Sequence, residues 1–526
     1  MVLFLIVYCI YVIYRSMEAM HMLQQNLYNE NNRYLKWVKK NYQRAFTLID
    51  FLPIILFLLV YVIEDAHILD LVLIGSMFIY IFGIILEYKR NQSNQNKLPL
   101  KATGRIKRLF TAHILIYGIA IYFTVTATNQ VIVPLFLILL CILLGTVYLV
   151  VEIANLLNTP INKLVYLHYF RKAKKKLKSY ANLDVVGITG SYGKTSSKNI
   201  LNAILQTSFN CYPSPKSFNT PYGLMNAINN GLDKFDEIFI AEMGAVHLRD
   251  IKILTDLVHP KYGIITTIGV AHLETFKTEE NIQKGKFQLI ENLPSDGVGV
   301  LNMDDPKQVS YKIKNNCKII WIAIDNQDAD YVATNIKLSG EGTTFDVKIN
   351  DKIYNFKTVL LGKHNIYNIL ASIALGIELG VDPNKLALAI QGLKPIEHRL
   401  ELKKYGNINI IDDAFNSNPV GSKMALEVLS YMNGKKIVVT PGMIELGPKE
   451  YEYNFKFGEY ISEVCDEVIL IGEKQTKPIY DGIVSKGYDK DKIHILNDVK
   501  LAFPLIQKLK GEYVLLENDL PDIFSE

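Results

Sequence analysis

Cysteine is scarce in this chain, and the cysteines that occur stand far apart. The 526 residues include five of them, and no two form a CxxC pair. They are Cys9, Cys141, Cys211, Cys317 and Cys465. Structural zinc sites and disulfide frameworks need closely or regularly spaced cysteines. The spacing therefore argues against both and is consistent with a reducing compartment.

Charged residues are also few. Only 21% of the chain is Asp, Glu, Lys or Arg, 49% is hydrophobic, and the mean hydropathy is +0.14. The apolar excess falls in residues 1–155, which we predict to be a transmembrane domain. The net charge of +5 is modest and many of the lysines lie beside the apolar runs, so the composition predicts no nucleic-acid partner.

Long apolar runs occupy this first part of the chain. A helix needs about 20 apolar residues to cross a bilayer. Five runs are predicted to do so: Met1–Tyr14, Phe46–Ile63, Ile68–Leu86, Leu109–Val125 and Val131–Ile153. The first is short, but Arg15 follows it and a small-residue cleavage site does not, which favours a span over a signal peptide. We expect no charge in the middle of a span, so nothing indicates a transporter or a proton path.

The charges of the connecting loops predict the orientation. Basic residues accumulate on the cytoplasmic side of membrane proteins. The first and third connections contain Arg33, Lys36, Lys39, Lys40, Arg44, Lys89, Arg90, Lys97, Lys101, Arg105, Lys107 and Arg108. The second and fourth, around residues 64–65 and 126–130, contain no lysine or arginine. With an odd number of spans, the chain is expected to be a multi-pass protein of the cell membrane with its remainder in the cytoplasm.

A basic linker, residues 156–183, is expected after the last span. It contains the run RKAKKKLK, Arg171 to Lys178. This run is interpreted first as a positive-inside stop signal, and contact with anionic lipid headgroups stays open beside it.

Residues Val185 to Ile200, VVGITGSYGKTSSKNI, predict a buried strand, a glycine turn and the start of a helix. Backbone N–H groups of such a turn and a lysine beside them suit a polyphosphate, and Thr195 suits a magnesium ion. The candidate nucleotide-binding residues are Thr189, Gly190, Ser191, Tyr192, Gly193, Lys194, Thr195 and Ser196. The turn is a variant of the P-loop, because Ile188 stands where that motif has its first glycine.

Beyond Asp184, apolar strand-like runs alternate with amphipathic helical ones, which predicts α/β architecture with a parallel sheet. Ligands bind at the carboxyl ends of such strands. Glu242 ends one predicted strand and can bind magnesium; Thr266, Thr267, Gly269 and His272 follow another. The loop from Ser217 to Gly223, SFNTPYG, is interpreted either as plain surface or as a carrier of substrate contacts.

Several ordered motifs resemble the Mur ligase family, and most of all its branch of UDP-N-acetylmuramoyl-tripeptide–D-alanyl-D-alanine ligases. They are TGSYGKTS, EMGA, TTIGVAHLETF, LGKHNIYNILASIALG, HRLE, DDAFNSNP and GMIELG. The resemblance covers residues from about 184 to 526 and none of the apolar part. It implies a central ATP-binding domain with a P-loop, residues 184–397, and a smaller Rossmann-like C-terminal domain, residues 398–526.

The resemblance also implies a reaction, in which ATP drives amide-bond formation through an acyl-phosphate. Lys194 would bind the β- and γ-phosphates, Thr195 and Glu242 one magnesium ion, and His272 a second. Lys286 aligns with a lysine that the family carbamylates, and Lys284 is its alternative. Lys194, His272 and Lys286 are thus the candidate catalytic residues.

Further roles follow from the same resemblance. Asn365 and Asn368 are expected near the adenine, although Asn at a helix start also caps helices. Arg399 and Asp413 are expected to reach the nucleotide from the last domain. Asn416 and Asn418 are candidates for holding the incoming amine substrate.

The resemblance leaves the acceptor open. The soluble relatives have an amino-terminal domain that holds a uridine-diphosphate sugar, and apolar helices take its place here. The leading hypothesis is a membrane-anchored ligase, requiring ATP and Mg²⁺, that adds an amino acid or dipeptide such as D-Ala-D-Ala to a nucleotide- or lipid-linked cell-wall precursor. The alternatives are an amino-acid polymer synthetase of the poly-γ-glutamate type and a non-catalytic nucleotide-binding membrane scaffold.

Overall fold

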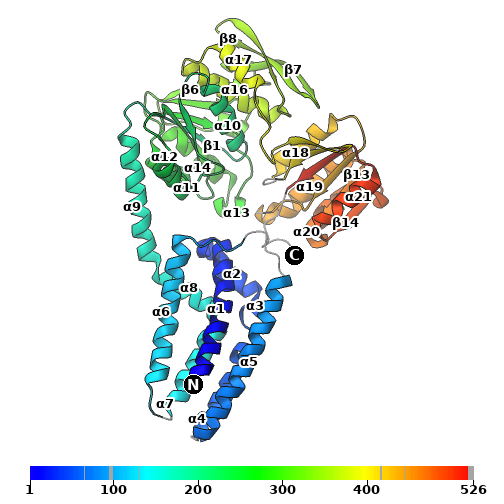
Figure 1. The fold of residues 1–526 in the computed structure, drawn as a ribbon. Coiled ribbons are helices and arrows are strands. Elements are labelled where there is room, and N and C mark those ends of the chain that lie inside the picture. Colours follow the sequence, from blue (N-terminus) through cyan, green and yellow to red (C-terminus); the bar gives the residue numbers. More distant parts are fainter. Residues whose placement is uncertain (64–65, 94–98, 130, 415–417, 445, 519–526) are drawn as a thin grey trace. The chain divides into compact units, whose positions relative to one another are not determined.

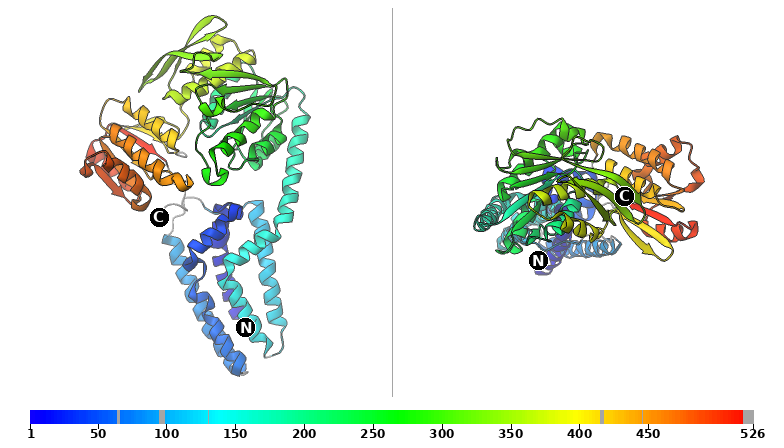
Figure 2. Two further views of the ribbon diagram at one scale, coloured as in Figure 1. Left: turned by 180° about the vertical axis from the view of Figure 1, so that it is seen from behind. Right: turned by 90° about the horizontal axis from the view of Figure 1, so that it is seen from above.

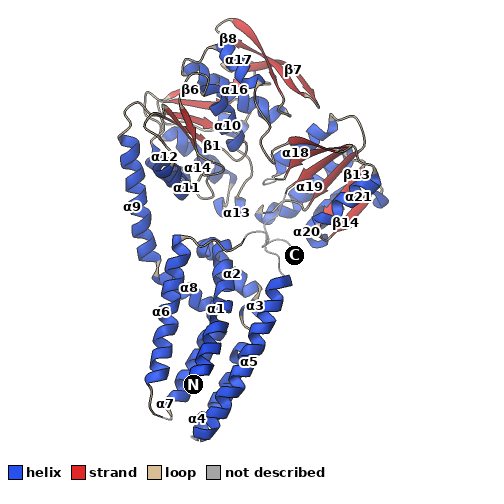
Figure 3. Ribbon diagram, viewed as in Figure 1, coloured by secondary structure: helices blue, strands red, loops and turns tan. Residues whose placement is uncertain are grey.

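The computed structural model describes the chain except residues 64–65, 94–98, 130, 415–417, 445 and 519–526. It divides into a helical unit, residues 1–167, and an α/β unit, residues 168–520. Figure 3 shows the strands confined to the second unit.

The helical unit contains α1 to α8 and the start of α9. Their bounds are α1 Val2–Gln25, α2 Arg33–Lys40, α3 Tyr42–Ala45, α4 Leu48–Ile63, α5 Ala66–Ser93, α6 Gly104–Thr126, α7 Ile132–Gly145, α8 Val147–Leu157 and α9 Thr159–Lys178. Helices α1, α5 and α6 are long and apolar enough to cross a membrane. The residues predicted as a basic linker include the 20-residue helix α9.

The expectation of five membrane spans needs correction at two places. Helix α4 is apolar but has only 16 residues, about 24 Å, which is less than the bilayer core. The predicted span Val131–Ile153 is broken into α7 and α8, which meet at 83°. At the break, the Thr146 hydroxyl donates to the Ile142 carbonyl at 2.7 Å, and the Phe51 ring lies where a side chain on Gly145 would be. Among the described residues, three helices and this bent pair therefore meet the length criterion.

The helix ends that border the two connections without basic residues lie at the same end of the helical unit. Figure 1 shows the end of α4, the start of α5, the end of α6 and the start of α7 together at its lower end. The end of α1, the end of α5 and the start of α6, which border the connections predicted to be cytoplasmic, lie at the other end. The arrangement of the helices thus agrees with the pattern of loop charges.

Charges inside the helical unit are a second correction, because none was expected in the middle of a span. Arg15 belongs to α1, is fully buried, and donates to the Asp50 carboxylate at 3.0 Å and to the Glu87 carboxylate at 3.2 Å. Asp50 lies inside the predicted span Phe46–Ile63 and also accepts from the Tyr11 hydroxyl at 2.7 Å. Helix α1 continues beyond the apolar run because these partners neutralise Arg15.

The α/β unit begins with a domain whose sheet orders its strands β2-β3-β1-β4-β5-β6-β7-β8-β9. The strands are β1 Asp184–Thr189, β2 Cys211–Pro213, β3 Ile238–Glu242, β4 Tyr262–Ile265, β5 Val298–Asn302, β6 Lys318–Ala323, β7 Tyr331–Ser339, β8 Gly342–Ile349 and β9 Lys352–Thr358. Pairing is parallel from β2 to β7, as predicted. The antiparallel pairs β7–β8 and β8–β9 were not expected from the sequence.

Helices cover both faces of the parallel part of this sheet (Figures 1 and 2). They are α10 Lys194–Leu205, α11 Pro221–Asn230, α12 Asp250–Val258, α13 Leu273–Phe276, α14 Glu279–Glu291, α15 Pro306–Val309, α16 Lys363–Glu378 and α17 Pro383–Gln391. Leu370, Ala374 and Leu375 of α16 are fully buried, as the helical spacing predicted. Burial of such apolar faces fixes the strand ends that carry the candidate site.

The C-terminal domain has a second sheet in the order β10-β11-β15-β12-β13-β14. Its strands are β10 Glu401–Tyr405, β11 Ile408–Asp413, β12 Lys436–Thr440, β13 Glu467–Ile471, β14 Ile493–Leu496 and β15 Tyr513–Glu517. Its helices are α18 Pro419–Ser430, α19 Glu450–Val464, α20 Glu473–Ser485 and α21 Ala502–Leu509. All its pairs are parallel except β10–β11.

Candidate active site

A glycine turn joins β1 to α10 at the carboxyl end of β1, as the sequence predicted. Gly190 has φ +150° and Gly193 has φ +78°, and a Cβ on Gly190 would lie 2.0 Å from the Thr266 hydroxyl oxygen. No L side chain fits that position. The buried Thr189 hydroxyl donates to the Met243 carbonyl at 2.9 Å, which fixes where the turn begins.

The loop that follows β4 holds this turn in place. The Ser191 amide donates to the Thr267 carbonyl at 2.7 Å, and the Ser191 hydroxyl donates to the Gly269 carbonyl at 2.8 Å. The Tyr192 hydroxyl donates to the Val270 carbonyl at 2.5 Å. The residues after β4 that the sequence indicated as ligand-bearing thus contribute backbone carbonyls that shape the nucleotide turn.

Lys194 is the first residue of α10, and its ammonium is folded back onto the turn. It donates to the Gly190 carbonyl at 2.8 Å and to the Ser191 carbonyl at 3.1 Å. Burial lowers its pKa to about 8; the charge of Glu242 opposes this shift and that of Arg399 adds to it. Thr195 follows Lys194, and Ser196 is buried. A polyphosphate would supply the negative charge that these neighbours do not.

Glu242 ends β3 and is 1% exposed. One of its carboxylate oxygens accepts from the Lys198 ammonium at 3.0 Å and the other from the Asn219 amide at 3.0 Å. Lys198 was not predicted from the sequence, although it stands four residues after Lys194 and hence on the same side of the helix. Asn219 belongs to the loop Ser217–Gly223, so that loop contributes to the site rather than being plain surface.

Lys286 lies on α14 and is 2% exposed, whereas Lys284 is exposed. The Lys286 ammonium donates to the Ala245 carbonyl at 3.5 Å and lies 5.9 Å from the centroid of the Phe276 ring. Burial, with the nearby charge of Lys194, holds its pKa well below the ordinary value of a lysine. An uncharged amine is the form that reacts with carbon dioxide, so the environment favours Lys286 over Lys284 as the carbamylation candidate.

The residues of the site are better suited to bind a nucleotide than to bind a magnesium ion without a nucleotide. Mg²⁺ usually keeps several waters and takes one or two carboxylates plus substrate phosphates. In the part of the chain that the structure describes, no three His, Cys, Asp or Glu residues are grouped to hold a metal. His272 has a left-handed backbone, φ 54°, just before α13 and belongs to no such group. Thr195 and Glu242 would hold a magnesium ion only together with nucleotide oxygens.

Asn365 and Asn368 lie in the first turns of α16 and do not cap it. The Asn365 amide donates to the Leu361 carbonyl at 2.8 Å. The Asn368 side-chain oxygen accepts from the Ser197 hydroxyl of α10 at 2.8 Å, and a Cβ on Gly193 would lie 2.9 Å from it. Asn368 therefore contacts the nucleotide turn itself.

Arg399 and Asp413 interact in the C-terminal domain. Burial lowers the pKa of Arg399, and the charge of Asp413 partly offsets this. Burial raises the pKa of Asp413 to about 6, although Arg399 opposes the shift. Asn418 caps α18, with its oxygen accepting from the Val420 amide at 3.1 Å and the Gly421 amide at 2.7 Å. Asn416 lies outside the described residues.

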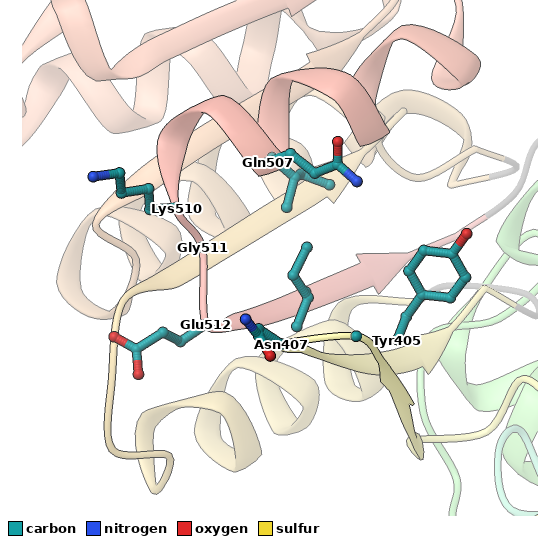
Figure 4. A pocket seen from close by; sticks show the side chains of 9 residues that line it. Tyr405, Asn407, Gln507, Lys510, Gly511 and Glu512 are labelled. Carbon is teal, nitrogen blue, oxygen red and sulfur yellow. The ribbon is translucent and has the colours of Figure 1, made fainter.

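Two hollows flank α21 in the C-terminal domain. One has a volume of about 530 Å³, and its lining includes Tyr405, Asn407, Gln507, Lys510 and Glu512 (Figure 4). The other, of about 490 Å³, lies beside it over β10, β11 and β15. Neither includes a residue predicted for catalysis or nucleotide binding.

This site, a glycine turn with lysines and a carboxylate at the ends of parallel strands, defines a nucleotide-dependent enzyme. Comparison with known families is consistent with this. The model of the Mur ligase middle domain matches residues 188–376, and that of the Mur ligase glutamate ligase domain matches residues 398–516. The chain belongs to the Mur ligase family and is an ATP-dependent, ADP-forming acid–amino-acid ligase.

The two relatives described next have the same name. The UDP-N-acetylmuramoyl-tripeptide–D-alanyl-D-alanine ligase of Bacillus subtilis is 32% identical over 340 residues, which are 63% of this chain and 72% of the relative. The Escherichia coli ligase of that name is 28% identical over 320 residues, 60% of this chain and 70% of its own. The MurF ligase of Thermotoga maritima, solved with ADP, superposes with a TM-score of 0.61 at 26% identity, covering 68% of this chain and 81% of that one.

Proposed function

We propose that this chain joins a D-alanyl-D-alanine-type dipeptide to a carboxylate of a cell-wall precursor, using ATP and Mg²⁺. The observation that carries the proposal is the similarity over 340 residues to the Bacillus subtilis enzyme, whose name states that reaction. The position of Lys194, Glu242 and Lys286 at the ends of β1 and β3 and on α14 supports it.

The residues divide the work of such a ligase. The N-terminus of α10 and Lys194 bind the phosphates, because backbone N–H groups and an ammonium meet there. Bound ATP with Mg²⁺ supplies the phosphoryl group that activates the acceptor carboxylate. Glu242 and Thr195 would hold the metal together with the phosphates, and Asn368 keeps the turn in shape through Ser197. Lys286, as a carbamate, would offer a negative group where the unmodified chain has a cation, and His272 is proposed as a further metal ligand.

The C-terminal domain is proposed to complete the site. Arg399 and Asp413 would bind the nucleotide, and Asn418, with Asn416, would hold the amine. The charges of Asp413 and of Glu242, the candidate metal ligand, both act on the buried Arg399, which supports this assignment.

We also propose that the helical unit anchors the enzyme in the cell membrane with the α/β unit in the cytoplasm. The basic loops after α1 and α5 must then both be cytoplasmic, which requires α4 to cross as well. A helix about 24 Å long can do so where the bilayer thins locally, at modest cost. Anchoring favours an acceptor that is itself near the bilayer, and the basic end of α9 favours anionic headgroups there.

One experiment tests the reaction and the acceptor together. The purified full chain in detergent is given ATP, Mg²⁺ and D-Ala-D-Ala with either the UDP-linked tripeptide precursor or its lipid-linked counterpart. The proposal expects ADP release and a product heavier by one dipeptide with one of them. A ladder of products from a single amino acid would indicate a polymer synthetase instead, and tight ATP binding without ADP release would indicate a scaffold.

A further inference from the structure

Lys198 forms an ion pair with Glu242 in the candidate site, but Lys198 has no role in the reaction described above. Both side chains are almost completely buried, with 1% exposed for each residue. They are 3.0 Å apart from ammonium nitrogen to carboxylate oxygen. A buried ion pair costs free energy to form, so a reason is needed for one that includes the proposed metal ligand, Glu242.

Neighbouring groups hold both members of the pair in place. The Lys198 ammonium also donates to the Lys216 carbonyl, and Lys216 has a left-handed backbone with φ 48°. Asn219 donates to the second oxygen of Glu242 at 3.0 Å, and the Asn219 carbonyl accepts from the Gly244 amide at 2.8 Å. The Ser214 hydroxyl accepts from the Glu242 amide at 3.2 Å. One loop, residues 214–219, thus holds both members of the pair.

The Lys198 ammonium therefore lies next to the Glu242 carboxylate, whose negative charge attracts cations. Lys198 neutralises Glu242, and one of the two carboxylate oxygens accepts a hydrogen bond from it. A magnesium ion that approached this carboxylate alone would meet an ammonium a few ångströms away. Repulsion between such charges in a buried site is strong, because the effective dielectric constant is low.

We propose that Lys198 is a positioning residue that stands in for the metal and makes metal binding at Glu242 depend on nucleotide. This inference rests on the proposed function, since it takes Glu242 as the residue that faces Mg²⁺. In the nucleotide-free chain, Lys198 holds Glu242 in place and keeps it from taking a divalent cation. A polyphosphate on the α10 turn adds several negative charges, which outweigh the repulsion by the ammonium and allow the metal to bind.

Metal binding without turnover tests the inference. Mn²⁺, which replaces Mg²⁺ and is visible by electron paramagnetic resonance, is titrated into the purified full chain in detergent at pH 8, without nucleotide. The wild type is expected to show no saturable Mn²⁺ binding even at millimolar metal. The variant Lys198→Met keeps the length of the side chain and removes its charge, and it is expected to bind Mn²⁺ at least about tenfold more tightly than the wild type.

Two further variants make the result specific. Lys198→Arg keeps the charge and should resemble the wild type. The double variant Lys198→Met/Glu242→Gln should lose the gained Mn²⁺ binding, because the gain is assigned to that carboxylate. ADP binding and the unfolding temperature of each variant show whether the turn and the fold are retained.

Three results would overturn the inference: equal Mn²⁺ affinity in the wild type and Lys198→Met, a gain that persists in the double variant, or tight Mn²⁺ binding by the nucleotide-free wild type. The last result needs no variant, so it decides the matter even where Lys198→Met does not fold. None of these measurements involves ligase turnover. Failure of the proposed reaction would appear as absent ADP release, whereas failure of this inference would appear only in the Mn²⁺ titrations.

Discussion

Both units of this chain bury charged side chains, but they balance them differently. In the helical unit, Arg15, Arg44 and Arg90 are paired with Glu18, Asp50 and Glu87, three positive charges with three negative ones. In the α/β unit, Lys198 is paired with Glu242, but the hydrogen bonds of Lys194 and Lys286 go to backbone carbonyls. A closed network stabilises a fold, whereas cations without matching anions form a site that a polyanion completes.

The largest expected effect breaks the closed network. Replacing Arg15 by Leu leaves Asp50 buried without its cation and Glu87 paired with Arg90 alone, which we expect to cost about 3–5 kcal/mol of the free energy of unfolding of the helical unit. Thermal unfolding in detergent measures this, and ATP binding by the α/β unit should stay unchanged. Lys36→Leu, at an exposed position of α2, is the matched control. A loss no greater than that of the control would show that the network does not stabilise the fold.

The next effect concerns Lys194 in the candidate site of the α/β unit. Lys194→Ala removes the ammonium that meets the phosphates, so we expect kcat/KM for ATP to fall by about 10²–10³, equal to about 3–4 kcal/mol of transition-state stabilisation. The unfolding temperature should not fall. Lys252→Ala is the control, because Lys252 is an exposed lysine paired with Asp256 on the surface of α12. Unchanged kinetics in Lys194→Ala would remove this lysine from the site.

The sequence predicted one of these two arrangements and not the other. The strand, glycines and Lys194 are contiguous, so local pattern was enough to place them, and the alternation of strands and helices predicted the parallel sheet. The pairing of Arg15 with Asp50 and Glu87 joins residues 35 and 72 positions apart, which local patterns do not connect. The same reason explains why Lys198 and Asn219 were missed around Glu242, and why the bend at Thr146 was not anticipated within a uniformly apolar run.

A smaller effect separates stability from function in the open site. Lys286→Met removes a buried amine whose hydrogen bond, in the part of the chain that the structure describes, goes to a backbone carbonyl and not to a carboxylate. We therefore expect the nucleotide-free protein to gain about 1–2 kcal/mol in free energy of unfolding near neutral pH while losing ligase activity. A burial-lowered pKa means that the unfolded chain binds more protons between the folded pKa and 10.5. The free energy of unfolding of the wild type should therefore rise with pH across that window.

The same variant tests whether Lys286 causes this rise of the free energy of unfolding with pH. Lys286→Met should lack the alkaline increase, which denaturant unfolding at several pH values measures. Lys284→Met, at the exposed neighbour, should keep both the increase and the activity. A destabilised Lys286→Met near neutral pH would mean that the lysine is compensated in the folded chain, and the contrast between the two units would then fail.

The smallest expected effect concerns a residue that serves the fold and is proposed to serve the substrate. Asn418→Ala removes the cap of α18 and should cost about 1 kcal/mol of the free energy of unfolding. Asn418→Ser can still cap the helix, so stability should return. If Asn418 also holds the amine through its side-chain amide, KM for the dipeptide rises in both variants while KM for ATP does not. A normal KM for the dipeptide in Asn418→Ser would show that Asn418 only caps α18. The part of the site that binds substrates would then consist of the buried lysines and the nucleotide turn.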